Sequence, residues 1–230
     1  MTAWHLATGT VTIDDRTYLV GNWFVRCAPY LLVYRTCTFR ALEARGEIMS
    51  TYRIHSIESA PEKSKSSLRG LKGAFGIIPN IAGIMAASPA LLNGFVGVFR
   101  EVHAGSFTEG QIQALLLTNA VTNRSAWPVA FHSALALKEG VTAADVQAIR
   151  ERRAPAEPKL AALSALTRAL IDGRGKVDAR ALDAFRAAGF GDEQVLEILA
   201  VLAASTMTNY ASNIAEPALE EMFQTHAWSA

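Results

Sequence analysis

The sequence predicts an all-α protein, and three features of the residues after Pro61 lead to this prediction. Alanine and leucine are abundant there, and both favour helices. Runs of β-branched residues, which would favour strands, are few. Glycine, proline, asparagine and serine recur at intervals of about one helix length and mark helix ends. We therefore expect a series of amphipathic helices joined by short turns.

Three helices are expected first, each bounded by recognisable turn residues: residues 62–75, 80–87 and 88–102. Gly76 and Pro79 end the first, because glycine favours a helix C-cap and proline cannot continue a helix. In the third, Ser88 is the expected N-cap and Pro89 takes the first helical position, where its missing N–H costs no hydrogen bond.

The next two helices, residues 108–123 and 125–138, form the most informative stretch. Thr108 is the expected cap of the first, which carries one face at the helical period: Ile112, Leu115, Leu116 and Asn119. Ser125 is the expected N-cap of the second, and Pro128 falls within its first turn, where a proline is tolerated.

The remaining helices are expected at residues 142–153, 159–172, 178–188 and 192–214, and a closing segment at residues 218–228 follows a turn at Pro217. Inward-facing residues are predicted for the second of these segments at Leu160, Leu163, Leu166 and Leu170. A core stripe is predicted for the long fourth segment at Val195, Leu199, Leu202 and Tyr210. We expect a solvated face at Arg150, Arg152 and Arg153.

Residues 1–48 differ in composition from the rest and are rich in Thr, Val, Tyr and Trp. The stretch TVTIDDRTYLV could form a hairpin around Asp14 and Asp15, because β-branched residues flank a turn-forming pair. Two interpretations compete: a β-rich extension, or upstream sequence preceding a true start at Met49. We favour the second, because a complete domain, residues 49–230, follows and the extension supplies no recognisable partner for it.

Length, charge and cysteine content narrow the classes of protein. A chain of 230 residues, half of them apolar, can bury one substantial core. A net charge of +1 gives no reason to expect nucleic acid or an anionic membrane as a partner. The only two cysteines, Cys27 and Cys37, are unlike a disulfide framework, so we expect a reducing, cytoplasmic setting. We find no membrane span, metal-ligand spacing or phosphate-binding loop, and expect neither metal nor cofactor.

The stretch QIQALLLTNAVTNRSAWPVAFHSALALKEG, residues 111–140, resembles the core motif of the AhpD-like alkylhydroperoxidase / carboxymuconolactone decarboxylase family. In that family a glutamate on one helix precedes a C-x-x-C-x-x-x-H on the next. Aligned on the histidine, His132 takes the histidine position, Pro128 and Ser125 take the cysteine positions, and Gln113 takes that of the glutamate. The order of elements over residues 56–228 also fits, and the resemblance implies an AhpD-like helical fold and a homo-oligomer, either a trimer or a hexamer.

The substituted positions exclude the family's redox chemistry at this motif. A peroxidatic thiolate is stabilised at a helix N-terminus, and a second cysteine resolves its sulfenic acid to a disulfide. Ser125 cannot form a sulfenic acid, Pro128 has no reactive side chain, and Gln113 cannot exchange a proton near neutral pH. Dithiol peroxidase activity is therefore not expected, and whether the protein is an enzyme stays open.

Three hypotheses follow. The first is a peroxidase-related protein that has lost its dithiol and keeps a small-molecule pocket near His132. The second is an acid/base enzyme like the carboxymuconolactone decarboxylases, in which His132 is the general acid or base and Ser125 or Gln113 orients the substrate. The third is a non-enzymatic oligomeric binding protein, which a pocket too small or too apolar for an anion would favour. In purely structural terms, His132 could be a core residue, Ser125 an N-cap, and Gln113 a partner of His132 or a surface residue.

Overall fold

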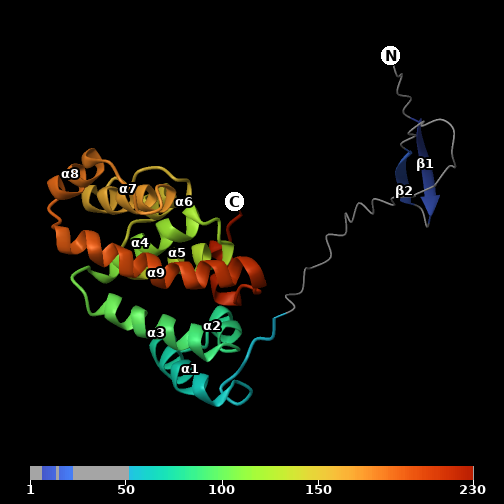
Figure 1. Ribbon diagram of the computed structural model, residues 1–230, viewed down its shortest axis with the longest axis horizontal. Coiled ribbons are helices and arrows are strands. Elements are labelled where there is room, and N and C mark those ends of the chain that lie inside the picture. Colours follow the sequence, from blue (N-terminus) through green and yellow to red (C-terminus); the bar gives the residue numbers. More distant parts are fainter. Residues whose placement is uncertain (1–6, 14–15, 23–51, 230) are drawn as a thin grey trace, which may run out of the picture. The chain divides into compact units, whose positions relative to one another are not determined.

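The computed structural model describes residues 7–13, 16–22 and 52–229 (Figure 1). The chain divides into two compact units, Met1–Glu47 and Ile48–Ala230. In the first unit, strand β1 (Ala7–Ile13) pairs antiparallel with β2 (Arg16–Asn22). This pairing is the hairpin that the sequence allowed. Asp14, Asp15 and both cysteines lie outside the described residues, and whether the protein starts at Met49 stays a prediction.

The described part of the second unit is all-α, as predicted. Its helices are α1 (Glu62–Phe75), α2 (Asn80–Met85), α3 (Pro89–His103), α4 (Glu109–Thr122), α5 (Ala126–Lys138), α6 (Ala143–Arg150), α7 (Pro158–Asp172), α8 (Ala179–Ala187) and α9 (Asp192–Ala215), followed by the 3-10 helix η1 (Glu221–His226).

The predicted capping residues set most helix boundaries. The Ser88 hydroxyl accepts a hydrogen bond from the backbone N–H of Leu91, and Thr108 forms a reciprocal capping box with Gln111. Gly76 ends α1 in the left-handed conformation, with φ of 77°. Helix α6 stops three residues before its predicted end, because Arg152 turns into the left-handed region and ends the helical path.

Helix α4 is the centre of the unit and is buried on all sides from Ile112 to Val121. It packs against α5, α7 and α9, and these helices surround it in Figure 1. The leucines predicted to face inward from α7 are all buried: Leu160, Leu163, Leu166 and Leu170. Helices α1, α2, α3 and α5 enclose a second apolar cluster that is rich in aromatic side chains.

The core stripe predicted for α9 is only partly right: Val195 and Leu202 are half-buried and pack against the core, but the other two residues face solvent. Leu199 and Tyr210 are 43% and 56% exposed, whereas the buried face includes Ser205, Asn209 and Ser212. Hydrogen bonds act together with the burial of Ile198 and Val201 to set the rotation of α9. The Asn209 amide donates to Asn119 of α4 at 2.9 Å, and its backbone oxygen accepts from the Ser125 hydroxyl at 3.2 Å. Among the described helices, α9 alone has the length and hydropathy of a membrane span. Its buried face, however, carries Ser205, Asn209 and Ser212 and packs inside the domain.

Arg150 also departs from the predicted solvated face. Its guanidinium donates to the Ser133 hydroxyl and to the backbone oxygens of His226 and Ala227, each at 2.9 Å. Burial lowers the pKa of Arg150. The residue therefore holds the C-terminal segment against α5, while the other two arginines of this group are exposed.

Candidate functional site

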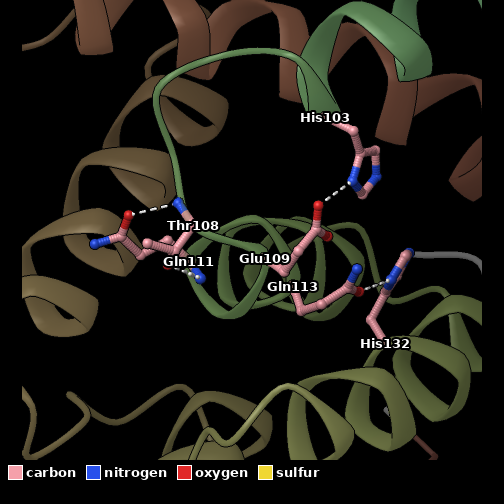
Figure 2. A network of polar contacts seen from close by, with 6 residues as sticks. All are labelled: His103, Thr108, Glu109, Gln111, Gln113 and His132. Atoms are coloured by element: carbon pink, nitrogen blue, oxygen red, sulfur yellow. Dashed lines mark hydrogen bonds and ion pairs between the residues drawn. The ribbon is translucent and has the colours of Figure 1, made fainter.

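His132 and Gln113 form a buried hydrogen-bonded pair between α5 and α4. The imidazole Nδ1 lies 2.9 Å from the Gln113 Oε1, and Figure 2 shows the two side chains pointing toward one another. His132 is 6% exposed and Gln113 is 4% exposed. Because an amide oxygen only accepts, Nδ1 carries the hydrogen and Nε2 keeps a free lone pair.

A tight turn between the two helices brings this pair together. Arg124 adopts a positive φ of 51°, and the Ser125 N–H donates back to the Ala120 carbonyl at 2.9 Å. The reversal lays α5 against α4, so that residues 19 positions apart face one another. The local sequence Asn123-Arg124-Ser125 therefore builds the geometry of the pair.

Burial keeps the His132 imidazole neutral. Loss of hydration lowers the pKa of His132 from 6.5 to about 3, and the charge of His103 lowers it further by a smaller amount. Gln113 supplies no negative charge that would oppose this effect. At neutral pH the imidazole is therefore a hydrogen-bond acceptor through Nε2, and it lacks the second proton that a general acid would donate.

His132 lines an inner cavity whose walls are otherwise almost wholly apolar. About 40 Å³ of this cavity can be reached by the centre of a water molecule. Its lining residues are Leu71, Phe75, Pro79, Ile81, Ala82, Met85, Phe95, Phe99, Leu116, Trp127, Phe131, His132, Ser205 and Thr208. The Thr208 hydroxyl donates to the Ser205 carbonyl, and the Ser205 hydroxyl accepts from Asn209. Among the described residues, His132 Nε2 has no hydrogen-bond partner.

Stacked aromatic rings make one wall of the inner cavity rigid. Trp127 stacks on Phe131 with ring centroids 4.9 Å apart, and Phe223 of η1 packs edge-on against Phe131. The Trp127 indole N–H donates to Glu220 at 2.9 Å, and the same carboxylate accepts the backbone N–H of Asn80. Glu220 thus joins the beginnings of α2 and α5 behind the cavity.

An outer groove of about 530 Å³ lies on the other side of Gln113. Its lining residues are Gly70, Leu71, Ala74, Phe75, Val96, Phe99, Arg100, His103, Ala104, Glu109, Gln113, Leu135, Lys138 and Glu139. Here His103 pairs with Glu109 at 2.9 Å, as Figure 2 shows. The side chain of Gln113 therefore lines the outer groove while its amide holds an imidazole that lines the inner cavity.

The third predicted site residue, Ser125, is not brought to this pair. It is fully buried, lines neither the inner cavity nor the outer groove, and gives its hydroxyl hydrogen to the backbone oxygen of Asn209. Ser125 does occupy the N-cap position of α5, but its side chain makes no capping hydrogen bond. The hydroxyl therefore fixes the contact with α9 and is not positioned to orient a ligand beside His132.

Sequence reasoning missed most of the residues that surround His132. Phe75 and Phe99 come from α1 and α3, outside the motif, and look like ordinary core aromatics in sequence. His103 and Glu109 are separated by a loop, so no helical spacing connects them. Within the described part of the chain, no group of three or more His, Cys, Asp or Glu side chains is placed to hold a metal ion.

Comparison with known proteins identifies the fold through structure alone. No family model matches the sequence, and no curated protein matches it. An uncharacterised peroxidase-related protein from Ralstonia eutropha JMP134, described as an alkylhydroperoxidase AhpD core, superposes with a TM-score of 0.67 at 17% identity. The alignment covers 76% of this chain and 94% of that one.

Two further solved structures are similar. A variant of the debrominase Bmp8 in complex with 2,3,4-tribromopyrrole has a TM-score of 0.64 at 18% identity, covering 79% of this chain and 96% of that one. A peroxidase-related protein from Silicibacter sp. TM1040 has a TM-score of 0.65 at 13% identity, covering 79% and 97%. The helical unit therefore has the AhpD-like, peroxidase-related fold that the sequence predicted.

Proposed function

We propose that the helical unit binds a small, uncharged, ring-shaped molecule in the inner cavity, beside His132, and that it does so without dithiol chemistry. One observation carries this proposal: a neutral imidazole with a free Nε2 acceptor lines an otherwise apolar cavity. Such a site pairs with a single hydrogen-bond donor on an apolar ligand, because few polar groups placed in an apolar pocket set the orientation of the ligand.

The residues around α5 argue against sulfur redox chemistry. Ser125 and Pro128 stand where the resembled motif has its cysteines, and the sequence has no cysteine between residues 52 and 229. The Ser125 hydroxyl is already committed to Asn209. A peroxide reaching His132 would meet no thiol on the helices that surround it.

The lining of the inner cavity favours an uncharged ligand over an anionic one. Neither arginine nor lysine lines it, and His132 stays neutral because its pKa is lowered to about 3. A carboxylate placed there would lose its hydration without gaining a partner of opposite charge, which costs several kcal/mol. This argues against a lactone acid of the kind that carboxymuconolactone decarboxylases take.

The free space of the inner cavity admits at most one small ring. It is about 40 Å³, against roughly 150 Å³ for an engineered cavity that binds benzene, so the cavity walls must move to seat a ring. The ligand of the structurally similar Bmp8 variant, 2,3,4-tribromopyrrole, is a ring with one N–H donor. It supports the choice of a pyrrole as the first probe for this chain.

Calorimetric titration with pyrrole and N-methylpyrrole tests the proposal. Pyrrole should bind about fivefold more tightly, because only pyrrole can donate a hydrogen bond to Nε2, and such a bond contributes about 1 kcal/mol. His132→Phe should remove this preference, and His103→Phe, the matched change in the outer groove, should leave it intact. Absence of binding, or equal binding of the two probes to the unsubstituted protein, would contradict the proposal.

An acid/base enzyme is the second candidate, and the free Nε2 beside a cavity favours it. With a conjugate acid of pKa about 3, His132 is a weak general base, so this candidate needs a substrate whose proton is unusually acidic. Turnover that survives His132→Ala would reject it.

The homo-oligomer and the cytoplasmic location stay predictions. Three apolar side chains of α9 are exposed and are the positions at which to test self-association: Leu196, Tyr210 and Ile214.

A further inference from the structure

Three apolar side chains separate the inner cavity from the outer groove. Leu71, Phe75 and Phe99 line both spaces, and we call them the shared wall. We infer that the two spaces are parts of one ligand site, whose ligand places a small uncharged ring beside His132 and a longer tail in the outer groove. This inference rests on the proposed function, because it extends the site of the ring.

The sizes of the two spaces require a division of this kind. The inner cavity offers about 40 Å³ and the outer groove about 530 Å³ by the same measure. A ligand confined to the cavity could be little larger than one ring. A ligand that fills both spaces is elongated, and only its end reaches Nε2.

The two spaces also differ in polarity, because charged side chains line only the larger one. The inner cavity has no charged residue in its lining, whereas Arg100 and Lys138 face the outer groove together with Glu109 and Glu139. The formal charges of these four residues cancel. The other side chains that line the groove are mostly apolar: Leu71, Ala74, Phe75, Val96, Phe99 and Leu135. The tail is therefore an uncharged and largely apolar chain that can end in a polar group.

The end of α1 is the part of the shared wall that can move. Phe75 is the last residue of α1, and Gly76 follows it in the left-handed conformation. The rest of this last turn is exposed, so that Phe75 alone anchors it, through ring contacts with Phe99 at 6.2 Å and Phe131 at 5.4 Å. Rotation of the Phe75 ring would join the two spaces without disturbing the buried Leu68, and local openings of this kind cost far less than unfolding.

Two glycines on α1 provide a matched pair of substitutions. Gly70 lines the outer groove, and Gly73, almost one turn later, lines neither space. A Cβ added at either glycine meets no heavy atom within 4 Å. Leucine also favours a helix more than glycine does, so both Gly70→Leu and Gly73→Leu should fold.

Calorimetric titration with pyrrole and 2-hexylpyrrole tests the inference. The unsubstituted protein should bind 2-hexylpyrrole at least about tenfold more tightly than pyrrole, because the alkyl chain is transferred from water into the outer groove. Gly70→Leu should remove this advantage and change the affinity for pyrrole by less than about twofold, since it fills the groove and not the cavity. Gly73→Leu should leave both affinities unchanged.

The outcomes separate this inference from the function on which it rests. If pyrrole fails to bind, or binds without regard to His132, the proposed function falls and the inference with it. If pyrrole binds through His132, but 2-hexylpyrrole gains nothing or loses affinity equally in the two glycine variants, only the inference is overturned.

Stopped-flow fluorescence of the same complexes tests whether movement of the Phe75 ring controls access to the inner cavity. Phe75→Ala should accelerate both association and dissociation of pyrrole by roughly tenfold, because it removes a ring that must move before binding. Phe95→Ala removes a ring from the inner cavity alone and should not accelerate association. Equal rates in the two variants would show that Phe75 does not control access.

Discussion

Two histidines on neighbouring elements make the same hydrogen bond in opposite surroundings. His103 Nδ1 lies 2.9 Å from Glu109, and His132 Nδ1 lies 2.9 Å from Gln113. Glu109 and Gln113 are one turn apart on α4. The side chains of the outer pair are 24% and 48% exposed, whereas those of the inner pair are buried. The same bond geometry therefore occurs once in a buried setting with a neutral partner and once in a partly exposed setting with a carboxylate partner, and at His132 burial keeps the imidazole neutral.

The comparison explains the effect of having a glutamine, and not a glutamate, at position 113. A carboxylate in this buried place would favour a protonated His132, because an opposite charge at hydrogen-bond distance stabilises the charged imidazole. The neutral amide holds the ring in the same orientation without stabilising a charge. The inner pair is thus suited to accepting a hydrogen bond from a neutral ligand.

The largest expected effect concerns stability in acid. The pKa of His132 is near 6.5 in the unfolded chain and about 3 in the folded one, so between these values the unfolded state binds the additional proton. The stability that the neutral ring provides is complete above pH 6.5 and is lost as the pH falls toward 3. Between pH 7 and pH 4 the free energy of unfolding of the unsubstituted protein should fall. This fall should exceed that of the His132→Phe variant by about 3 kcal/mol.

Urea unfolding at both pH values measures this difference. His103→Phe is the control for the loss of a histidine, because it leaves the buried His132 in place, and it should keep the part of the acid sensitivity that His132→Phe removes. If His132→Phe loses as much stability in acid as the unsubstituted protein, the two histidines do not differ as described.

A smaller effect should separate the two partners on α4. Gln113→Leu leaves a buried imidazole N–H without an acceptor, which should lower the free energy of unfolding by about 1–3 kcal/mol at pH 7. Glu109→Leu breaks a partly exposed pair and should cost less than about 1 kcal/mol. Equal losses in urea unfolding would mean that burial does not distinguish the pairs.

Much of the helical framework could be predicted, because local signals determine it. Helix α1 has its predicted bounds, and the periodic leucines of α7 face the core. The face of α9 could not be predicted in this way. Asn209 turns inward and donates a hydrogen bond to Asn119, ninety positions earlier in the chain. The hydropathy pattern of α9 does not indicate a hydrogen bond of this kind.

The candidate site was predictable only in part. The motif placed Gln113 and His132 on adjacent helices, and the structure pairs them. The motif also pointed to Ser125, whose hydroxyl is instead taken by the backbone of α9. The cavity walls from α1 and α3 depend on how distant helices pack, so Phe75 and Phe99 could not be assigned to the site from their own sequence neighbourhood.

The most direct test is nuclear magnetic resonance of the ring nitrogens of His132 in isotopically labelled protein. At pH 7 the imidazole should be neutral with its hydrogen on Nδ1, and it should remain so on titration down to pH 4, because its pKa is lowered to about 3. A ring that gains a proton near pH 6.5, or that carries its hydrogen on Nε2, would contradict the account of a neutral acceptor facing an apolar cavity.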